Sequence, residues 1–223
     1  MKSLKLTKLA FVIAALAGSI ATASASVVWD LNPTNANANV GSSSHTFTSS
    51  GYQITATGWD NVSGPDTLHQ LYYKNLGTSE HGLGLVGTAN NELQINSNGT
   101  PANYIQLDLT SILAQGFING KIEVGSVQSG ESFLLFGSNS AGTLGTQLGG
   151  TFGASNDSTF ISVPSFGTYK FISVAAASGD VLPVAFKADI APVPEVNALL
   201  PIIGLGVAFA GFQFVSRRRK VSA

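Results

Sequence analysis

The sequence predicts an all-β protein in which residues 26–190 form a jelly-roll-like antiparallel β-sandwich. Short segments along this stretch alternate apolar and polar side chains, as strands with one buried face do. Clusters of Gly, Asn and Ser separate these segments and favour turns. Only residues 110–115 have a helical pattern. Residues 32–50 and 137–158 are poor in large apolar side chains, which predicts long surface loops or edge strands.

The predicted strands differ in the pattern that indicates them. Residues 52–57, 104–109 and 121–124 alternate apolar with polar side chains, which predicts one face in the core and one in solvent. Residues 132–136 form a continuous apolar run that suits a strand buried on both faces. The remaining predicted strands are residues 27–31, 159–163, 169–174 and 181–190.

The 223-residue chain is lightly charged and slightly apolar overall. Charged residues make up 10% of it, and residues 26–194 combine four lysines with eleven acidic residues, a net charge of −7. The apolar composition argues against a disordered chain, and the missing basic surface argues against nucleic-acid binding. The chain has no cysteine, which excludes disulfides, thiolate metal sites and a cysteine nucleophile.

The N-terminus has the pattern of an export signal. Three lysines within the first eight residues precede an apolar run over residues 9–20. Ala23 and Ala25 then provide the small-x-small spacing that signal peptidase accepts. We therefore expect residues 1–25 to be a signal peptide whose removal leaves Ser26 as the mature N-terminus.

The C-terminus has a second apolar run, over residues 198–215, which ends against a cluster of cations. A helix of this length spans about 27 Å, close to the hydrocarbon thickness of a bilayer. The cations stay on the cytoplasmic side of such a transmembrane helix, so residues 26–194 are expected outside the inner membrane. The cations of this membrane stop signal are Arg217, Arg218, Arg219 and Lys220.

A short motif precedes the second apolar run. Val193, Pro194 and Glu195, followed by that run and the arginine cluster, resemble a PEP-CTERM sorting signal. Val196 stands where that family has a second proline. The resemblance implies that residues 191–223 form a sorting signal, with a proline spacer ahead of the membrane helix. It also implies processing by an exosortase-type enzyme near Pro194, transient contact with the membrane, and a Gram-negative host that makes exopolysaccharide.

The stretch between the two signals resembles the sandwich domains that often accompany PEP-CTERM signals. Those domains are mostly uncharacterised, so this resemblance implies a fold and no activity. The matching segments are, in chain order, residues 80–85, 90–93, 104–109 and 125–131.

Carboxylates and amides gather around a Gly-Leu-Gly-Leu segment in the first half of the chain. Oxygen ligands in a glycine-rich loop suit a hard cation such as calcium, and the negative net charge favours one. The same pattern is also typical of tight turns with acids that face solvent. A third interpretation is a glycosidase, which needs two carboxylates such as Glu80 and Glu92 at a defined separation. The candidate calcium ligands are Glu80, Asn90, Asn91 and Glu92.

Three aromatic residues, Trp59, Tyr72 and Tyr73, are candidates for stacking against sugar rings. Aromatic side chains of a sandwich also fill its core, where they bury a large area. Tyr72 and Tyr73 are neighbours in the sequence and point to opposite faces if they lie in a strand. At most one of the two is then exposed on a given face.

The sequence carries no catalytic or nucleotide-binding pattern. The histidines, His45, His69 and His81, have none of the spacings typical of metal ligands, and there is no Gly-x-Ser-x-Gly elbow. We expect an exported, non-catalytic protein of the cell surface or extracellular matrix, associated with exopolysaccharide. The alternatives are a calcium-assisted carbohydrate-binding module and a glycan-active hydrolase.

Overall fold

β-Strands make up most of the chain that the computed structural model describes. The predicted sorting motif, membrane helix and basic tail lie outside the described residues, as do residues 1–23 of the predicted signal peptide. No helix in the described part of the chain is long and apolar enough to cross a membrane. The described residues are 24–34, 36–62, 65–77 and 80–192.

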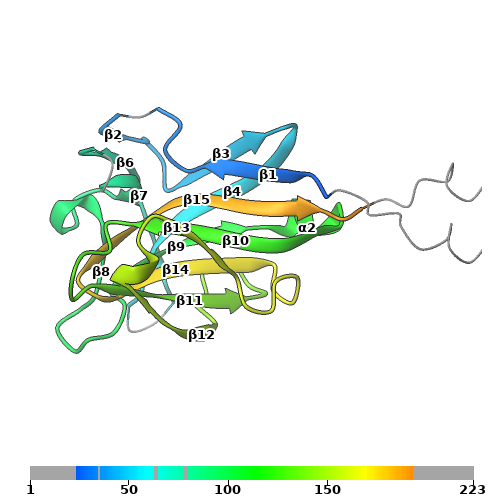
Figure 1. Cartoon of the computed structure of the whole chain (residues 1–223). Coiled ribbons are helices and arrows are strands. Elements are labelled where there is room, and N and C mark those ends of the chain that lie inside the picture. Colours follow the sequence, from blue (N-terminus) through cyan, green and yellow to red (C-terminus); the bar gives the residue numbers. More distant parts are fainter. Residues whose placement is uncertain (1–23, 35, 63–64, 78–79, 193–223) are drawn as a thin grey trace, which may run out of the picture. The chain divides into compact units, whose positions relative to one another are not determined.

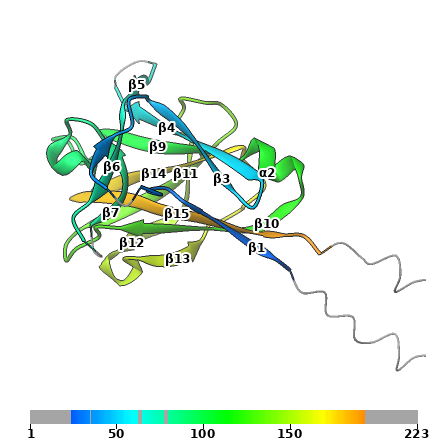
Figure 2. The same ribbon diagram turned by 90° about the horizontal axis from the view of Figure 1, so that it is seen from above.

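Two larger sheets pack on each other as a sandwich, and all their strand pairs are antiparallel (Figures 1 and 2). The predicted all-β antiparallel sandwich is therefore confirmed. The first sheet has the order β1 (Ser26–Asp30), β15 (Asp180–Ile190), β10 (Phe117–Gly125) and β13 (Thr159–Ser162), with β8 (Leu93–Gln94) paired to β15. The second has the order β12 (Thr146–Gly153), β11 (Ser132–Ser138), β14 (Phe171–Ser178), β9 (Asn103–Asp108), β4 (Tyr52–Asp60) and β3 (Ser44–Ser49), with β5 (Thr67–His69) paired to β4.

A small third sheet lies at the end of the sandwich away from the start of β1 and the end of β15 (Figure 1). Its strands are antiparallel, and one of them packs against β15. The order is β2 (Ala38–Asn39), β6 (Leu71–Asn75) and β7 (His81–Leu85). The helices of the described residues are short: η1 (Ala89–Asn91), α2 (Thr110–Ala114) and η2 (Ala154–Asn156).

An aromatic cluster fills part of the core between the two larger sheets. The ring centroid of Trp29 in β1 lies 5.7 Å from that of Phe117 and 5.9 Å from that of Phe186. The Trp29 indole N–H donates a 3.0 Å hydrogen bond to the carbonyl oxygen of Tyr52, so its one polar atom is paired inside the protein. Full burial of a Phe side chain stabilises a fold by about 1.5–3 kcal/mol. Such clusters therefore provide much of the stability of a chain without cysteine.

The stretches that lack large apolar side chains contain edge strands as well as loops. Residues 32–50 include β2 and β3, and residues 137–158 include β12. β3 and β12 are the outer strands of the second sheet, where one side of the strand is open and fewer apolar residues are needed. The strands β5, β6, β7 and β8 were not predicted from the sequence. In β7, Gly82 and Gly84 interrupt the apolar pattern with residues that disfavour strands.

The first and last strands of the compact unit Ala25–Ala191 are paired with each other. β1 pairs with β15 so that Ser26 lies opposite Asp189. The Ile190 N–H donates a 2.8 Å hydrogen bond to the carbonyl oxygen of Ala25. The Ser26 hydroxyl also donates a hydrogen bond to the Asp189 carboxylate. Both ends of this unit therefore lie side by side at the same end of the first sheet.

Candidate functional site

Two glycines of β7 bring distant segments together at the small sheet. A Cβ atom on Gly84 would lie 1.8 Å from the carbonyl oxygen of Asn91, so only glycine lets η1 pack on the strand. A Cβ atom on Gly82, whose φ is +154°, would lie 2.7 Å from the carbonyl oxygen of Pro183 in β15. Gly84 pairs directly with Tyr72 of β6. The η1 segment therefore lies beside Tyr72.

These segments enclose an open cleft of about 520 Å³, which we call the Tyr72 cleft. It includes three of the four predicted calcium ligands and one of the three predicted stacking residues. The lining is mostly polar, and it comes from the loop before β2, from β6, from the segment between β6 and β7, and from η1. The lining residues are Asn37, Tyr72, Lys74, Leu76, Glu80, Asn90 and Asn91.

Lys74 connects the two predicted glutamates. Its ammonium group donates a hydrogen bond to the Glu92 carboxylate and lies 2.9 Å from Oε2 of Glu80. The side chains of Lys74 and Glu92 are 5% and 3% exposed, whereas that of Glu80 is 29% exposed. The fourth predicted calcium ligand, Glu92, is thus buried behind the cleft. The positive charge between the two carboxylates belongs to the protein itself.

The two predicted amide ligands also have partners within the protein. The Asn90 side-chain amide donates a 2.7 Å hydrogen bond to the Asp180 carboxylate. The Asn91 side-chain oxygen accepts a 2.9 Å hydrogen bond from the Gly87 N–H. Among the described residues, no three His, Asp or Glu side chains are grouped so that they could hold a metal ion. The structure thus brings the predicted ligands into one region, where they bind groups of the protein.

Burial and hydrogen bonding have opposite effects on the charged groups of this cluster. Burial raises the pKa of Glu92, and the hydrogen bonds from Lys74 and Ser126 offset only part of that shift. Burial alone would lower the pKa of Lys74, but hydrogen bonds to the Glu92 and Glu80 carboxylates outweigh it, so the Lys74 pKa is raised. A charged lysine therefore faces a carboxyl group whose burial favours protonation.

The other two predicted stacking residues lie elsewhere. Tyr73 is on the opposite face of β6, 6% exposed, and its ring makes an edge contact with His45 at 5.9 Å between centroids. The ring of Trp59 in β4 lies against Gly142, where a Cβ atom would come within 2.7 Å of it. Trp59 and Tyr73 thus pack within the protein, and Tyr72 alone of the three lines the cleft.

The three histidines occupy separate, structural positions. His69 uses both ring nitrogens: Nδ1 lies 2.7 Å from the Asp60 carboxylate and Nε2 lies 2.7 Å from the Val86 carbonyl oxygen. His45 packs on Phe47 and Tyr73. Nε2 of His81 lies 3.9 Å from the Asp30 carboxylate. His69 therefore connects β4 and β5 to the segment after β7.

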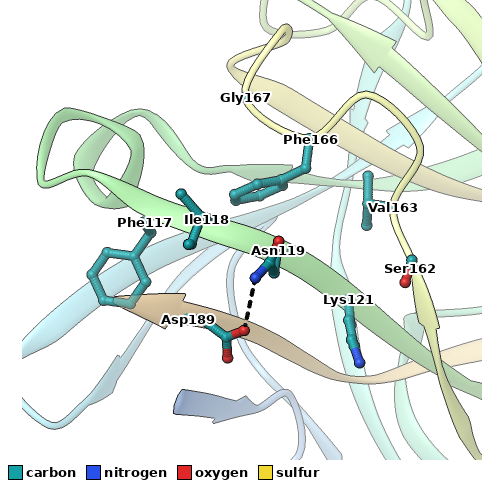
Figure 3. Close-up of a pocket in the computed structure, with 10 residues that line it drawn as sticks. Phe117, Ile118, Asn119, Lys121, Ser162, Val163, Phe166, Gly167 and Asp189 are labelled. Carbon is teal, nitrogen blue, oxygen red and sulfur yellow. Dashed lines mark hydrogen bonds between the residues drawn. The ribbon is translucent and has the colours of Figure 1, made fainter. Parts of the chain in front are cut away.

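A second pocket, of about 730 Å³, contains none of the site residues predicted from the sequence (Figure 3). It lies beside a bulge in β10, where the pairing with β15 shifts between Ile118 and Lys121. Asn119 in this bulge has a left-handed backbone, with φ of 55°. Its side-chain amide points to Asp189 and donates a 3.2 Å hydrogen bond to the carboxylate (Figure 3). An Asn-Gly pair inside a strand pattern is the sequence signal that indicates such a bulge.

Asn119 and Asp189 of this second pocket are hydrogen-bonded to each other. The hydrogen bond from Ser26 is the main cause that lowers the pKa of Asp189, and Asn119 and two nearby lysines add to it while burial opposes it. The ring of Phe166 covers Gly120, where a Cβ atom would lie 2.1 Å from it. The pocket therefore presents an apolar ring and a carboxylate that the protein already binds.

Comparison of the chain with protein-family models, with curated proteins and with solved structures finds no match. The geometry of the Tyr72 cleft is therefore the basis for a function. The cleft is lined by one aromatic ring, three side-chain amides and one carboxylate, with a buried ammonium group at its base. Each amide also makes a hydrogen bond within the protein, which fixes its position in the lining. This combination suits a neutral, hydroxyl-rich ligand.

Proposed function

We propose that the chain is an exported, non-catalytic protein of the cell surface or extracellular matrix that binds exopolysaccharide through the Tyr72 cleft. One observation carries the proposal: an aromatic ring, amides and a carboxylate from separate segments line one open cleft. Sugar rings can pack their C–H faces on an aromatic ring. Their hydroxyl groups exchange hydrogen bonds with amides and carboxylates, which both occur in the cleft.

Calcium is not required in this proposal. Lys74 already supplies a positive charge between Glu80 and Glu92. A calcium-assisted module would need a cation bound by Glu80 together with the side chains of Asn90 and Asn91. A glycan-active hydrolase would need Glu92 to reach its substrate, although this side chain is 3% exposed. Binding without calcium and without catalysis is therefore the function that this geometry favours.

Export and sorting are part of the same proposal. It assumes a signal peptide over residues 1–25, a jelly-roll-like sandwich, and a membrane helix and sorting signal within residues 191–223. One structural fact supports it: the compact unit runs from Ala25 to Ala191, and its first and last strands pair with each other. Removal of both flanking segments would thus leave every described strand in place. An exosortase-type enzyme and signal peptidase would be the processing partners.

Binding is tested by the retention of purified protein on immobilised neutral and acidic polysaccharides. We expect Tyr72→Ala to weaken retention about tenfold, a loss of ~1.4 kcal/mol, because the stacking ring is removed. Phe160→Ala is the matched control, since Phe160 is an aromatic residue of β13 that is 38% exposed and lies outside the cleft. A chelator is expected to leave retention unchanged.

Three results would count against this assignment. Equal retention of the Tyr72→Ala variant and the wild type would show that the Tyr72 cleft does not bind the polysaccharide. Loss of retention with chelator would favour the calcium-assisted module. Release of reducing sugar ends that stops in Glu92→Gln would favour the hydrolase. The mass of the mature protein from its host tests sorting separately, because an intact C-terminus in the membrane fraction would contradict it.

A further inference from the structure

The cluster of Lys74, Glu92 and Glu80 is unusual for a protein interior. Lys and Glu are rarely buried, and here both partners of the inner pair are almost fully enclosed. Burying an ion pair costs more than it returns unless the geometry is excellent, so such a pair is weak evidence for a stabilising role. The cluster also has a third member, Glu80, which contacts the same ammonium group from the cleft side.

We propose that Lys74 and Glu92 become joined by an intramolecular isopeptide bond, with Glu80 as the residue that carries the proton. This inference goes beyond the proposed function, although its residues lie at the base of the same cleft: the bond would neutralise Lys74 and leave the Glu80 carboxylate facing the ligand. A cross-link of this kind would give an exported chain without cysteine a covalent connection that disulfides cannot supply.

The reaction balances without an oxidant, a reductant or a cofactor. One proton first passes from the Lys74 ammonium group to the Glu92 carboxylate. Nζ of Lys74, now a neutral amine, then attacks Cδ of the carboxylic acid, and a new N–C bond forms. The C–O bond to the hydroxyl group breaks, and one water molecule leaves. Glu80 takes a proton from the Lys74 nitrogen and returns it to the departing hydroxyl group. The product is an amide and all charges balance.

Position and burial both favour this step. The hydrogen bond between Lys74 and Glu92 holds the nitrogen next to the carboxyl carbon that it would attack. Burial limits the access of water that would reverse the reaction. Burial also raises the pKa of Glu92, which favours the protonated acid, and the hydrogen bond from Ser126 polarises the carboxyl group.

One feature of the cluster opposes the step and gives Glu80 its role. The hydrogen bonds to both carboxylates raise the pKa of Lys74, so the attacking nitrogen starts as an ammonium group. Glu80 lies 2.9 Å from this nitrogen, so it can take up the ammonium proton and pass it to Glu92. The bond is therefore expected to form slowly in the folded protein, as a maturation step.

The link would connect β6 to the segment that follows η1. The enclosed segment contains β7 and the residues of η1 that line the Tyr72 cleft. These elements would then stay together when the rest of the small sheet opens. Wild-type protein is expected to show a higher unfolding temperature after maturation than the Lys74→Met variant.

The test is the intact mass of the folded full chain, followed by tandem mass spectrometry. We expect a mass below that of the sequence by one water molecule. Chymotrypsin cleaves after Tyr73, Leu76, Leu85 and Leu93, so it should release residues 74–76 joined to residues 86–93. The joined peptide identifies the bond directly, and this measurement on wild-type protein does not depend on whether a variant folds.

Variants assign the roles. Lys74→Met should abolish the link, and Glu80→Gln should slow its formation at least tenfold in folded protein. Lys170→Met, which changes a lysine outside the cluster, should leave it unchanged. Separate peptides and the full mass after prolonged incubation of folded wild type would overturn the proposal. Equal rates in Glu80→Gln and wild type would overturn the role of Glu80. The link is read from the mass of the wild type, whereas polysaccharide binding is read from its retention, so failure of one proposal is distinguishable from failure of the other.

Discussion

The hydroxyl group of Tyr104 donates a 2.6 Å hydrogen bond to the Asp66 carboxylate. Tyr104 lies in β9 and is fully buried, whereas Asp66 belongs to the connection between β4 and β5. Burial, together with the neighbouring Asp66 charge, raises the pKa of Tyr104 well above its usual value. This bond attaches a surface segment to the middle of the second sheet and satisfies a buried hydroxyl group.

Loss of the Asp66 carboxylate is expected to destabilise the fold. Asp66→Ala leaves the buried Tyr104 hydroxyl without its acceptor and should lower the free energy of unfolding by about 1–3 kcal/mol. Tyr104→Phe removes the hydroxyl donor together with the free-energy cost of burying it, and should lower the free energy of unfolding by about 0.5–1.5 kcal/mol. Urea unfolding at neutral pH measures both. A larger loss in Tyr104→Phe than in Asp66→Ala would contradict this account.

The same bond predicts a loss of stability at high pH. A tyrosine whose pKa is raised in the folded state contributes stability below its unfolded pKa of about 10, and this contribution is lost as the pH rises further. Wild-type protein should therefore lose stability above pH ~10 more steeply than Tyr104→Phe. Unfolding midpoints compared between neutral and alkaline buffers give the difference, and parallel curves for the two proteins would exclude it.

Gly84 is predicted to be required for the Tyr72 cleft. A Cβ atom in Gly84→Ala would meet the Asn91 carbonyl oxygen at 1.8 Å, so η1 must move away from β7. We expect a loss of about 1–3 kcal/mol in the free energy of unfolding, together with weaker polysaccharide retention. Gly150→Ala is the control, because a Cβ atom there has open space and its backbone is not left-handed. Similar stability of the two variants would show that η1 is free to shift.

The sequence predicts the fold well where strands have one face in the core. Residues 52–57 and 121–124 alternate and lie within β4 and β10, because burial on one side imposes a period of two. The prediction was wrong for β9, where the alternating residues 104–107 are all buried, and for β11, where the apolar run 132–136 alternates buried with half-buried positions. β7 was missed for the opposite reason: its glycines are selected by close packing on β15 and η1, which a local pattern does not contain. Tertiary contacts outweighed strand propensity at this position.

The candidate site was only partly predictable. The cluster of oxygen-bearing residues around Glu80 and Asn90 indicated the right region, since polar side chains near glycines favour functional loops. Lys74 was missed, because it precedes Glu92 by 18 residues and lysine is normally exposed. Lys74 lies in β6, whereas Glu80 and Glu92 lie in later segments of the chain, and its ammonium group takes the place between them that a metal ion would need. Only the fold brings it into place.

Asp189 is predicted to contribute stability that is lost in acid. Its pKa is lowered, first by the hydrogen bond from Ser26, so the contribution is present above the unfolded pKa of about 3.9 and declines as the pH falls through the folded value. The stability difference between wild type and Asp189→Asn should therefore shrink below pH ~4. Ser26→Ala, which removes the main cause of the shift, should show a smaller acid effect than wild type. A difference that stays constant down to pH ~2 would contradict this linkage.

The indole N–H of Trp59 is buried and has no hydrogen-bond partner. It is the one such side-chain atom in the part of the chain that the structure describes. An unpaired buried donor is costly, so Trp59→Phe removes a penalty of about 1–3 kcal/mol while it loses part of a packed ring. We expect these effects to cancel to within about 1 kcal/mol. Gly142→Ala should instead destabilise, because its φ is +65° and a Cβ atom would lie 2.7 Å from the Trp59 ring. Urea unfolding separates the two variants.

Polysaccharide retention should be unchanged in Trp59→Phe, since this ring packs against Gly142 outside the Tyr72 cleft. If Trp59→Phe costs as much as a typical core truncation, the N–H must have a water partner that compensates its burial.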